Sequence, residues 1–561
     1  MKRGKRWFLI LCLAVVVALG FSGELWAIDL FDGKLKVHGF LDNETGMRLK
    51  ERTWNDKVIG LAPLPSSLSD VSARAEENKL SVMRSTLLLD GEYDITDSLR
   101  FGFIFRGYYD AKWDLDDSIG TANEFNGHPS GWDANDLRAW PDGEYLEEDV
   151  DLREYFLIWD LGNFKIKAGR QQIVWGEADA IRISDIINPL DYSKDYTTTA
   201  YGLNWEDVRI PQRMIDITYV VPESPQQFEV EAVLNPEDSR VNTYSPYGEL
   251  YYGVPGELSL YPMRDVLMSF GLPDLGFTRT SMHDAVMRAI DDANPDSNSA
   301  SFSGGMRVRA VLGGWDTHLF YYYQRAQIPS FTSTGNFGGG MPFPWDAFAD
   351  DLGIRAHYPH QSTVGATFNY FHDTSGTVFR GEFGYTIDQP YTGERQGSFA
   401  PGLEWGGWFN DSVVYKDTIK YMLGFDRPTW ISFLNRTNTF FITGQFIHTL
   451  ILNYDDEVAG RDNKLLLTTV MGKDGHADHQ TMFSLKVNTK YYDDRIKPDL
   501  LVVWDVNGHD GYVKPVLGWE PNYDWRVELG VLYFWADSYS CGPFGPVKDD
   551  DQIFGVVKWR F

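Results

Sequence analysis

The chain of 561 residues carries 131 formal charges and 11 histidines, and these are the groups that could do chemistry. In the stretch KDGHADH, the residues His476, Asp478 and His479 place imidazole nitrogens and a carboxylate close together. Such a set holds a divalent metal when its geometry is fixed and outer hydrogen bonds orient the ligands. We keep these three residues as a candidate metal site and expect no bound cofactor.

Other chemistry finds less support in the sequence. There is no nucleophile elbow, H-E-x-x-H pair, phosphate loop or dinucleotide fingerprint in a supporting context. The formal net charge of −29 argues against nucleic acid as a partner, because phosphate binding needs clustered Lys and Arg. The sequence therefore predicts a protein that is not an enzyme.

Within many segments along the chain, charged residues alternate with apolar residues. In SLRFGFIFRGYY, Phe101 and Phe103 share one face, whereas Arg100 and Arg106 share the other. A period of two predicts a β-strand, and one apolar face opposite one polar face is typical of a barrel wall between lipid and a polar interior. Because the inward charges nearly balance, we expect most to pair across strands and a few to set selectivity. The lumen candidates are Arg100, Arg106, Arg307, Arg309, Arg380, Glu382, Lys486, Lys490, Arg526 and Glu528.

About 18 such strands are predicted, which gives an all-β fold, an antiparallel transmembrane β-barrel. A further apolar run, KLLLTTVM, is assigned to a long loop. The expected strands cover 35–45, 80–94, 98–111, 151–161, 163–171, 211–221, 227–234, 303–312, 316–326, 361–371, 377–388, 416–425, 437–451, 480–492, 498–506, 511–519, 524–536 and 552–561.

Connections between these strands alternate between short turns and long loops, which is the pattern of outer-membrane barrels. We expect the short turns to be periplasmic and the long loops to be extracellular. No linker or change of composition divides the chain, so residues 28–561 are predicted to form one barrel domain.

The two ends fit this location. Residues 1–27 combine a basic start, an apolar run and a small residue at Ala27, which predicts a cleaved signal peptide. The last strand, IFGVVKWRF, places Val557, Trp559 and Phe561 on its lipid face. We expect these three to act as an assembly signal for the barrel assembly machinery. The predicted location is therefore the outer membrane of a Gram-negative bacterium.

Two stretches resemble a known family. AGRQQIVWGEADAIRISDIINPLDYSKDY contains Gly169, Trp175, Gly176 and Pro189, and a second stretch from Arg427 to Asp456 contains the motif GQFIH. Together they resemble the proteobacterial outer-membrane barrel family called domain of unknown function 1302. The resemblance implies a barrel in the outer membrane. Members are often linked with efflux or lipid-transport machinery, which implies apolar cargo and a periplasmic or inner-membrane transport partner.

The first stretch is too apolar for an uncovered surface loop. We expect loop 172–210 to fold into the barrel mouth as a constriction or partial plug, with Asn188-Pro189 forming a rigid turn. The alternative is a packed loop that only stabilises the rim. The constriction candidates are Arg170, Gln171, Trp175, Glu177, Asp179, Arg182, Asp185, Asn188 and Asp191.

Three functions remain open from the sequence. The first is a porin-like channel or transporter for solutes or amphipathic substrates. The second is a gated outer-membrane component of an envelope export or lipid-transfer system. The third is a structural or adhesive barrel whose acidic loops bind lipopolysaccharide through Ca²⁺ or Mg²⁺. In all three, outer-membrane lipids and lipopolysaccharide are expected partners.

Overall fold

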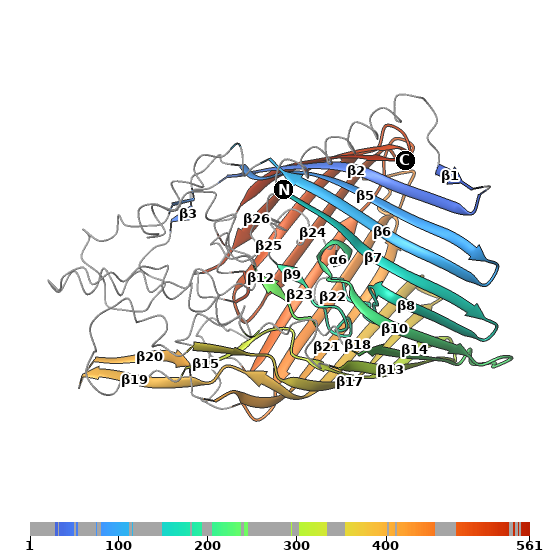
Figure 1. Cartoon of the computed structure of the whole chain (residues 1–561). Helices are drawn as coiled ribbons and strands as arrows, with labels where there is room; N and C mark the ends of the chain where they lie inside the picture. Colours follow the sequence, from blue (N-terminus) through green and yellow to red (C-terminus); the bar gives the residue numbers. More distant parts are fainter. Residues whose placement is uncertain are drawn as a thin grey trace.

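The computed structural model contains one closed antiparallel sheet of 18 long strands (Figure 1). It describes residues 28–31, 33–49, 52–53, 74–75, 80–111, 115, 148–179, 182–192, 205–236, 240–244, 293, 302–333, 354–400, 403–409, 412–454, 478–537, 542–544, 548 and 551–561. The barrel strands are β2 (Leu35–Arg48), β5 (Leu80–Thr96), β6 (Leu99–Asp110), β7 (Glu148–Leu161), β8 (Phe164–Gln171), β10 (Gln212–Val220), β11 (Glu229–Asn235), β13 (Ser303–Leu312), β14 (Trp315–Arg325), β17 (His360–His372), β18 (Thr377–Tyr391), β21 (Val414–Thr429), β22 (Phe440–Ile451), β23 (His479–Asn488), β24 (Ile496–Asp505), β25 (Asp510–Trp519), β26 (Trp525–Trp535) and β27 (Gln552–Arg560).

The last strand closes the barrel on the first. β27 pairs with β2 from Phe40 opposite Arg560 to Arg48 opposite Gln552. A three-residue strand, β1 (Ile28–Leu30), adds to the start of β2 without entering the ring. The prediction of an all-β, 18-stranded antiparallel barrel is confirmed, and each predicted strand overlaps one of those observed.

The two faces of the wall differ as the alternation predicts. Leu319, Leu423 and Leu529 are more than half exposed on the outside, whereas Tyr322 and Met422 are fully buried on the inside. An apolar exterior around a closed barrel is the surface that faces lipid in membrane-spanning barrels. No helix in the described part of the chain is long and apolar enough to cross a membrane.

The two rims are unequal. Eight connections at one rim are short, such as 97–98, 162–163 and 313–314, and the start of β2 and the end of β27 lie at the same rim. Connections at the other rim are mostly long, although 506–509 is a short exception.

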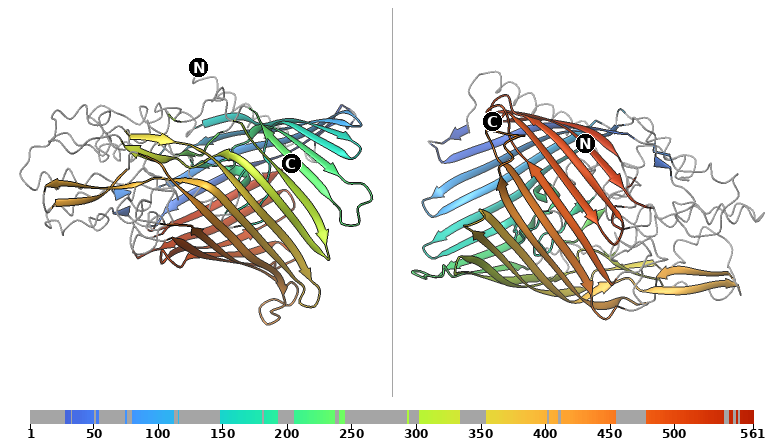
Figure 2. Two further views of the ribbon diagram at one scale, coloured as in Figure 1. Left: turned by 90° about the horizontal axis from the view of Figure 1, so that it is seen from below. Right: turned by 180° about the vertical axis from the view of Figure 1, so that it is seen from behind.

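Small elements accompany the long connections. Two hairpins, β15 (Ser330–Ser333) with β16 (Ile354–His357) and β19 (Glu394–Ala400) with β20 (Leu403–Phe409), leave the barrel at the rim with long connections (Figures 1 and 2). The remaining small elements are β3 (Arg52–Thr53), β4 (Arg74–Ala75), β9 (Asp191–Tyr192), β12 (Thr243–Tyr244) and α6 (Trp205–Val208). The predicted signal peptide 1–27 and the run KLLLTTVM lie outside the described residues.

Candidate functional site

The chain turns into the barrel where β8 ends. Trp175 is 2% exposed; its Nε1 donates to Glu231 on β11 at 3.0 Å, and its ring lies 5.6 Å from that of Tyr322 on β14. Farther along, the backbone N–H of Asp179 reaches Gln445 Oε1 on β22 at 3.3 Å. We call residues 172–179 and 182–190 the crossing segment.

The crossing segment spans the bore. Around the ring from β8, the successive partners are β10, β11, β13, β14, β17, β18, β21 and β22. β22 is therefore the eighth strand from β8 in a ring of 18, close to the opposite wall. Gln445 lies near the middle of β22, so the contact is made well inside the barrel and not at its rim.

Glu382, in the middle of β18, holds the tip of this segment. Its Oε1 accepts the backbone N–H groups of Glu177 and, at 2.5 Å, Ala178; its Oε2 accepts that of Ser184 at 2.9 Å. Glu382 is 3% exposed, and a buried carboxylate is stable only with such donors around it. One side chain of the wall thus fixes both limbs of the segment.

Arg380, two residues earlier on β18, binds the same tip. Its Nη1 donates to the carbonyl of Glu177 at 2.7 Å, and its Nη2 contacts Asp179 Oδ2 at 2.8 Å. Asp426 on β21 also pairs with Arg380, at 2.8 Å from Nε. Gln445 Nε2 donates to the same Asp179 oxygen at 3.1 Å, so the contacts at the tip are polar on all three strands.

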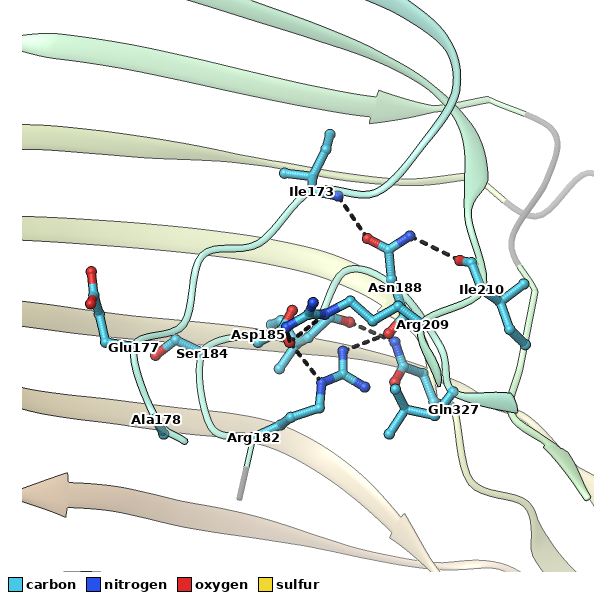
Figure 3. A network of polar contacts seen from close by, with 12 residues as sticks. Ile173, Glu177, Ala178, Arg182, Ser184, Asp185, Asn188, Arg209, Ile210 and Gln327 are labelled. Atoms are coloured by element: carbon cyan, nitrogen blue, oxygen red, sulfur yellow. Dashed lines mark hydrogen bonds and ion pairs between the residues drawn. The ribbon is translucent and has the colours of Figure 1, made fainter. Parts of the chain in front are cut away.

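The returning limb is held by a buried ion-pair cluster (Figure 3). Asp185 Oδ2 lies 3.0 Å from Arg182 Nε and 2.7 Å from Arg209 Nη2, and Asp185 is 5% exposed. Asn188 accepts the N–H of Ile173 at 2.9 Å and donates to the carbonyl of Ile210 at 2.9 Å. These contacts tie the two limbs to each other and to the chain just before β10.

Two further contacts fix the limb to the wall. Gln212, the first residue of β10, donates to the carbonyl of Ile187 at 2.9 Å. Gln327, just after β14, donates to the carbonyl of Ile186 at 2.6 Å (Figure 3).

Gly176 allows the two limbs to approach each other. A Cβ atom at this position would lie 2.7 Å from the backbone nitrogen of Asp185, closer than real side chains pack. Any other residue there would push the limbs apart, which gives a physical reason for glycine.

α6 forms a second contact surface inside the barrel. Arg153 on β7 donates to the carbonyl of Arg209 at 2.6 Å, and Arg106 on β6 donates to that of Asp207 at 3.2 Å. The side chain of Gln172 donates to the carbonyl of Glu206 at 3.2 Å. The crossing segment and α6 therefore support each other on the side of the wall formed by β6 and β7.

The structure brings most predicted constriction residues together. Trp175, Glu177, Asp179, Arg182, Asp185 and Asn188 lie in the crossing segment, and Gln171 precedes it on the inward face of β8. Asp191 lies in β9, where its carboxylate accepts the hydroxyl of Thr243 at 2.7 Å.

The structure contradicts the prediction that Arg170 belongs to the constriction. Arg170 shares the outward face of β8 with the exposed Phe164 and pairs with Asp151 at 3.0 Å, so it does not belong to the constriction. The reason is the period of two, which puts Arg170 on the face opposite its neighbour Gln171.

The predicted lumen charges pair mainly with neighbouring strands, as the near balance of signs predicts. Arg526 instead pairs with Glu528 on its own strand, and Lys490, past the end of β23, pairs with Asp494 in the adjoining turn. Arg106 and Glu382 bind backbone groups inside the barrel. The pairs are Arg100 with Glu92 and Asp160, Arg307 with Glu231, Arg309 with Asp316, Lys486 with Asp499, and Arg526 with Glu528 and Glu520.

The inward wall also carries an apolar patch that was not predicted from the sequence. Met422, Ile447, Met482, Leu501 and Leu532 come from five strands between β21 and β26, and each is at most 4% exposed. Ile183 of the crossing segment packs into the same cluster. The signal was present, because apolar residues occupy the predicted inward positions of several consecutive strands.

Two of the three residues of the candidate metal site, Asp478 and His479, lie within the described residues. His479 Nδ1 lies 2.6 Å from Asp478 Oδ1, whereas His476 lies outside the described residues. Within the described ranges, no three His, Cys, Asp or Glu side chains gather in a geometry that could hold a metal ion.

Comparison with known proteins gives a family and distant structural likenesses. The family model described as "Protein of unknown function (DUF1302)" matches residues 8–561. No curated protein matches this sequence.

Among solved structures, a BenF-like porin from Pseudomonas fluorescens is similar at 8% identity and a TM-score of 0.44, covering 95% of this chain and 100% of that one. The outer membrane channel DcaP of Acinetobacter baumannii is similar at 9% identity and a TM-score of 0.36, covering 96% of this chain and 100% of that one. Likeness at this level carries no argument about what passes through the barrel.

Proposed function

We propose that this chain, which belongs to the DUF1302 family, is a porin-like channel of the outer membrane. The description of the family names no activity. In this proposal the crossing segment narrows the passage at mid-height. The observation that carries the proposal is the contact of Glu382 with both limbs of the segment, far from either rim.

The dimensions of the barrel support a passage. Barrels of 16 to 18 strands leave an aqueous channel unless something fills the interior. Here a segment from one wall reaches nearly to the opposite wall, so the interior is divided but its wall remains that of a large barrel.

The chemistry at the tip supports selectivity. Arg380, Asp426 and Asp179 concentrate charge of both signs where the segment meets the wall. Charged groups at a constriction set which ions pass and at what rate. We propose that these three residues act as the selectivity-determining charges of the channel.

Single-channel conductance of the purified, refolded protein in a planar bilayer tests the proposal. A matched variant replaces residues 176–186 by Gly-Gly, which the close limbs allow because Ile173 N lies 2.9 Å from Asn188 Oδ1. Glu382→Ala removes the acceptor for both limbs. Lys490→Gln, a change in a turn at the rim, is the control.

We expect small, steady conductance in the intact protein and in Lys490→Gln, and severalfold larger conductance in the deletion and in Glu382→Ala. If the intact protein does not conduct but the variant lacking residues 176–186 does, the proposal of an open channel is wrong. The barrel would then be a gated component of an export or lipid-transfer system. Silence in all four proteins would overturn the transport function.

A further inference from the structure

Lys420 on β21 is a cation inside the barrel that no carboxylate of the described residues pairs with. It lies on the inward face between Thr418 and Met422, both fully buried. Neither a hydrogen bond nor an ion pair joins Lys420 to the described residues, and its charged neighbour is Arg182 of the crossing segment, a second cation. Lys420 is half-buried. An unpaired charge held partly away from water is costly, so this position favours an anion brought from outside.

The wall beside Lys420 is apolar. Met422, Ile447 and Met482 are successive register partners on β21, β22 and β23, and each is at most 2% exposed. Leu501 and Val503 continue the cluster on β24. Thioether side chains adapt to the shape of what they touch, so two methionines suit a flexible chain.

Other lumen charges differ from Lys420. Arg307, Arg309 and Lys486 each have a carboxylate within 3.6 Å. Those residues are already neutralised by the wall. Lys420, in contrast, has no ion-pair partner in the described part of the chain and lies beside an apolar surface.

We propose that Lys420 and the wall formed by Met422, Ile447 and Met482 bind an alkyl carboxylate. The carboxylate pairs with the ammonium group of Lys420, with Arg182 adding positive field, and the alkyl chain lies along the apolar side chains. This deepens the proposed function by naming a class of substrate, and it rests on that function for its transport role only.

Ile183 occupies the site in this structure. It packs on the same cluster, and its Cγ2 lies 3.7 Å from where a Cβ of Gly384 would be. The alkyl chain and Ile183 therefore compete for one surface, so binding of the carboxylate displaces the side chain of Ile183 from the wall.

Photolabelling of the full chain in phospholipid vesicles tests the site. The probe is dodecanoate carrying a diazirine near its methyl end, and the labelled residues are mapped by mass spectrometry. Dodecanoate, butyrate and dodecyltrimethylammonium serve as competitors, because they separate the contribution of charge from that of chain length. The variants are Lys420→Met, Lys420→Arg and Ile183→Ala, with Lys490→Gln as the control.

We expect labels on Ile447 and Met482, displaced by dodecanoate but not by the other two competitors. Lys420→Met should reduce this labelling about tenfold, which corresponds to the loss of one charged hydrogen bond. Lys420→Arg should keep it, and Ile183→Ala should increase it.

Labels confined to outward residues such as Phe483 and Leu485, or labelling that is indifferent to Lys420→Met, would overturn the site. The two proposals fail separately. A barrel silent in planar bilayers but labelled at Met482 would keep the site and lose the channel, whereas a conducting barrel without this label would keep only the channel.

Discussion

Asp185 shows how much of the crossing segment depends on single buried groups. Its carboxylate lies between the guanidinium groups of Arg182 and Arg209, and all three side chains are at most 10% exposed. Removing one member of a buried ion pair leaves the remaining charge without a partner, which is far more costly than the loss of an exposed pair.

Asp185→Asn is therefore expected to free the returning limb. Breaking a buried pair costs about 3 kcal/mol, so local opening should become more frequent by roughly a hundredfold. Hydrogen exchange at the amides of Ser184 and Ile186 measures this opening.

The control for this prediction is Asp151→Asn, which removes the more exposed ion-pair partner of Arg170. We expect it to change exchange at Ser184 by less than about threefold. Equal protection of Ser184 in the two variants would contradict the role given to Asp185.

Several of the residues that bind the crossing segment could not be identified from the sequence. The inward position of Glu382 follows from alternation, but its contacts with residues 205 and 198 positions earlier do not. Pairing Asp185 with Arg209 requires knowing that the chain before β10 returns beside the segment. Alternation along β8 also places Arg170 on the outward face, although the sequence had put it among the constriction candidates.

Among the elements, the crossing segment is a tight hairpin whose limbs touch at Gly176. The Cβ of a larger residue would overlap the backbone of Asp185. The limbs would then separate while the wall stayed intact, because the strand pairings of β8 and β10 do not involve Gly176.

Gly176→Val should thus increase single-channel conductance as the Glu382→Ala change does. The matched control is Gly555→Ala on β27, where the new Cβ would meet its nearest atom at an ordinary 3.6 Å. We expect the control to conduct like the unchanged protein. A Gly176→Val channel with unchanged conductance would show that the limbs do not limit the passage.

The barrel strands were predictable because lipid on one side and a mixed interior on the other impose a period of two on every strand. The fold of the long connections was harder to predict, because irregular segments lack a period that the sequence could reveal. The inward course of residues 172–190 followed from an excess of apolar residues, whereas its path to β18 and β22 needed the structure.

For the whole molecule, closure depends on the pairing of β27 with β2. Trp559 faces Leu41, Arg560 faces Phe40, and Phe561 exchanges two backbone hydrogen bonds with Gly39 at 2.9 and 3.0 Å. These pairs remove the two free edges that an open sheet would expose.

Deletion of Trp559, Arg560 and Phe561 is expected to prevent insertion into the outer membrane. Fractionation of cells and the heat-dependent mobility that folded barrels show on gels would measure it. Lys558→Gln, which changes an inward residue and leaves the strand complete, should insert normally. A truncated chain that inserts like the full chain would contradict the assembly signal proposed for Val557, Trp559 and Phe561.

The residues that bind each other at the tip are far apart in the sequence, and this affects the order in which the barrel can fold. Glu177 and Asp179 are bound by Glu382 and Gln445, which follow them by 205 and 266 residues. A nascent wall that ends before β18 offers the hairpin nothing to hold it across the bore. The tip of the crossing segment can therefore be fixed across the bore only once β18 and β22 are in place, late in the completion of the wall.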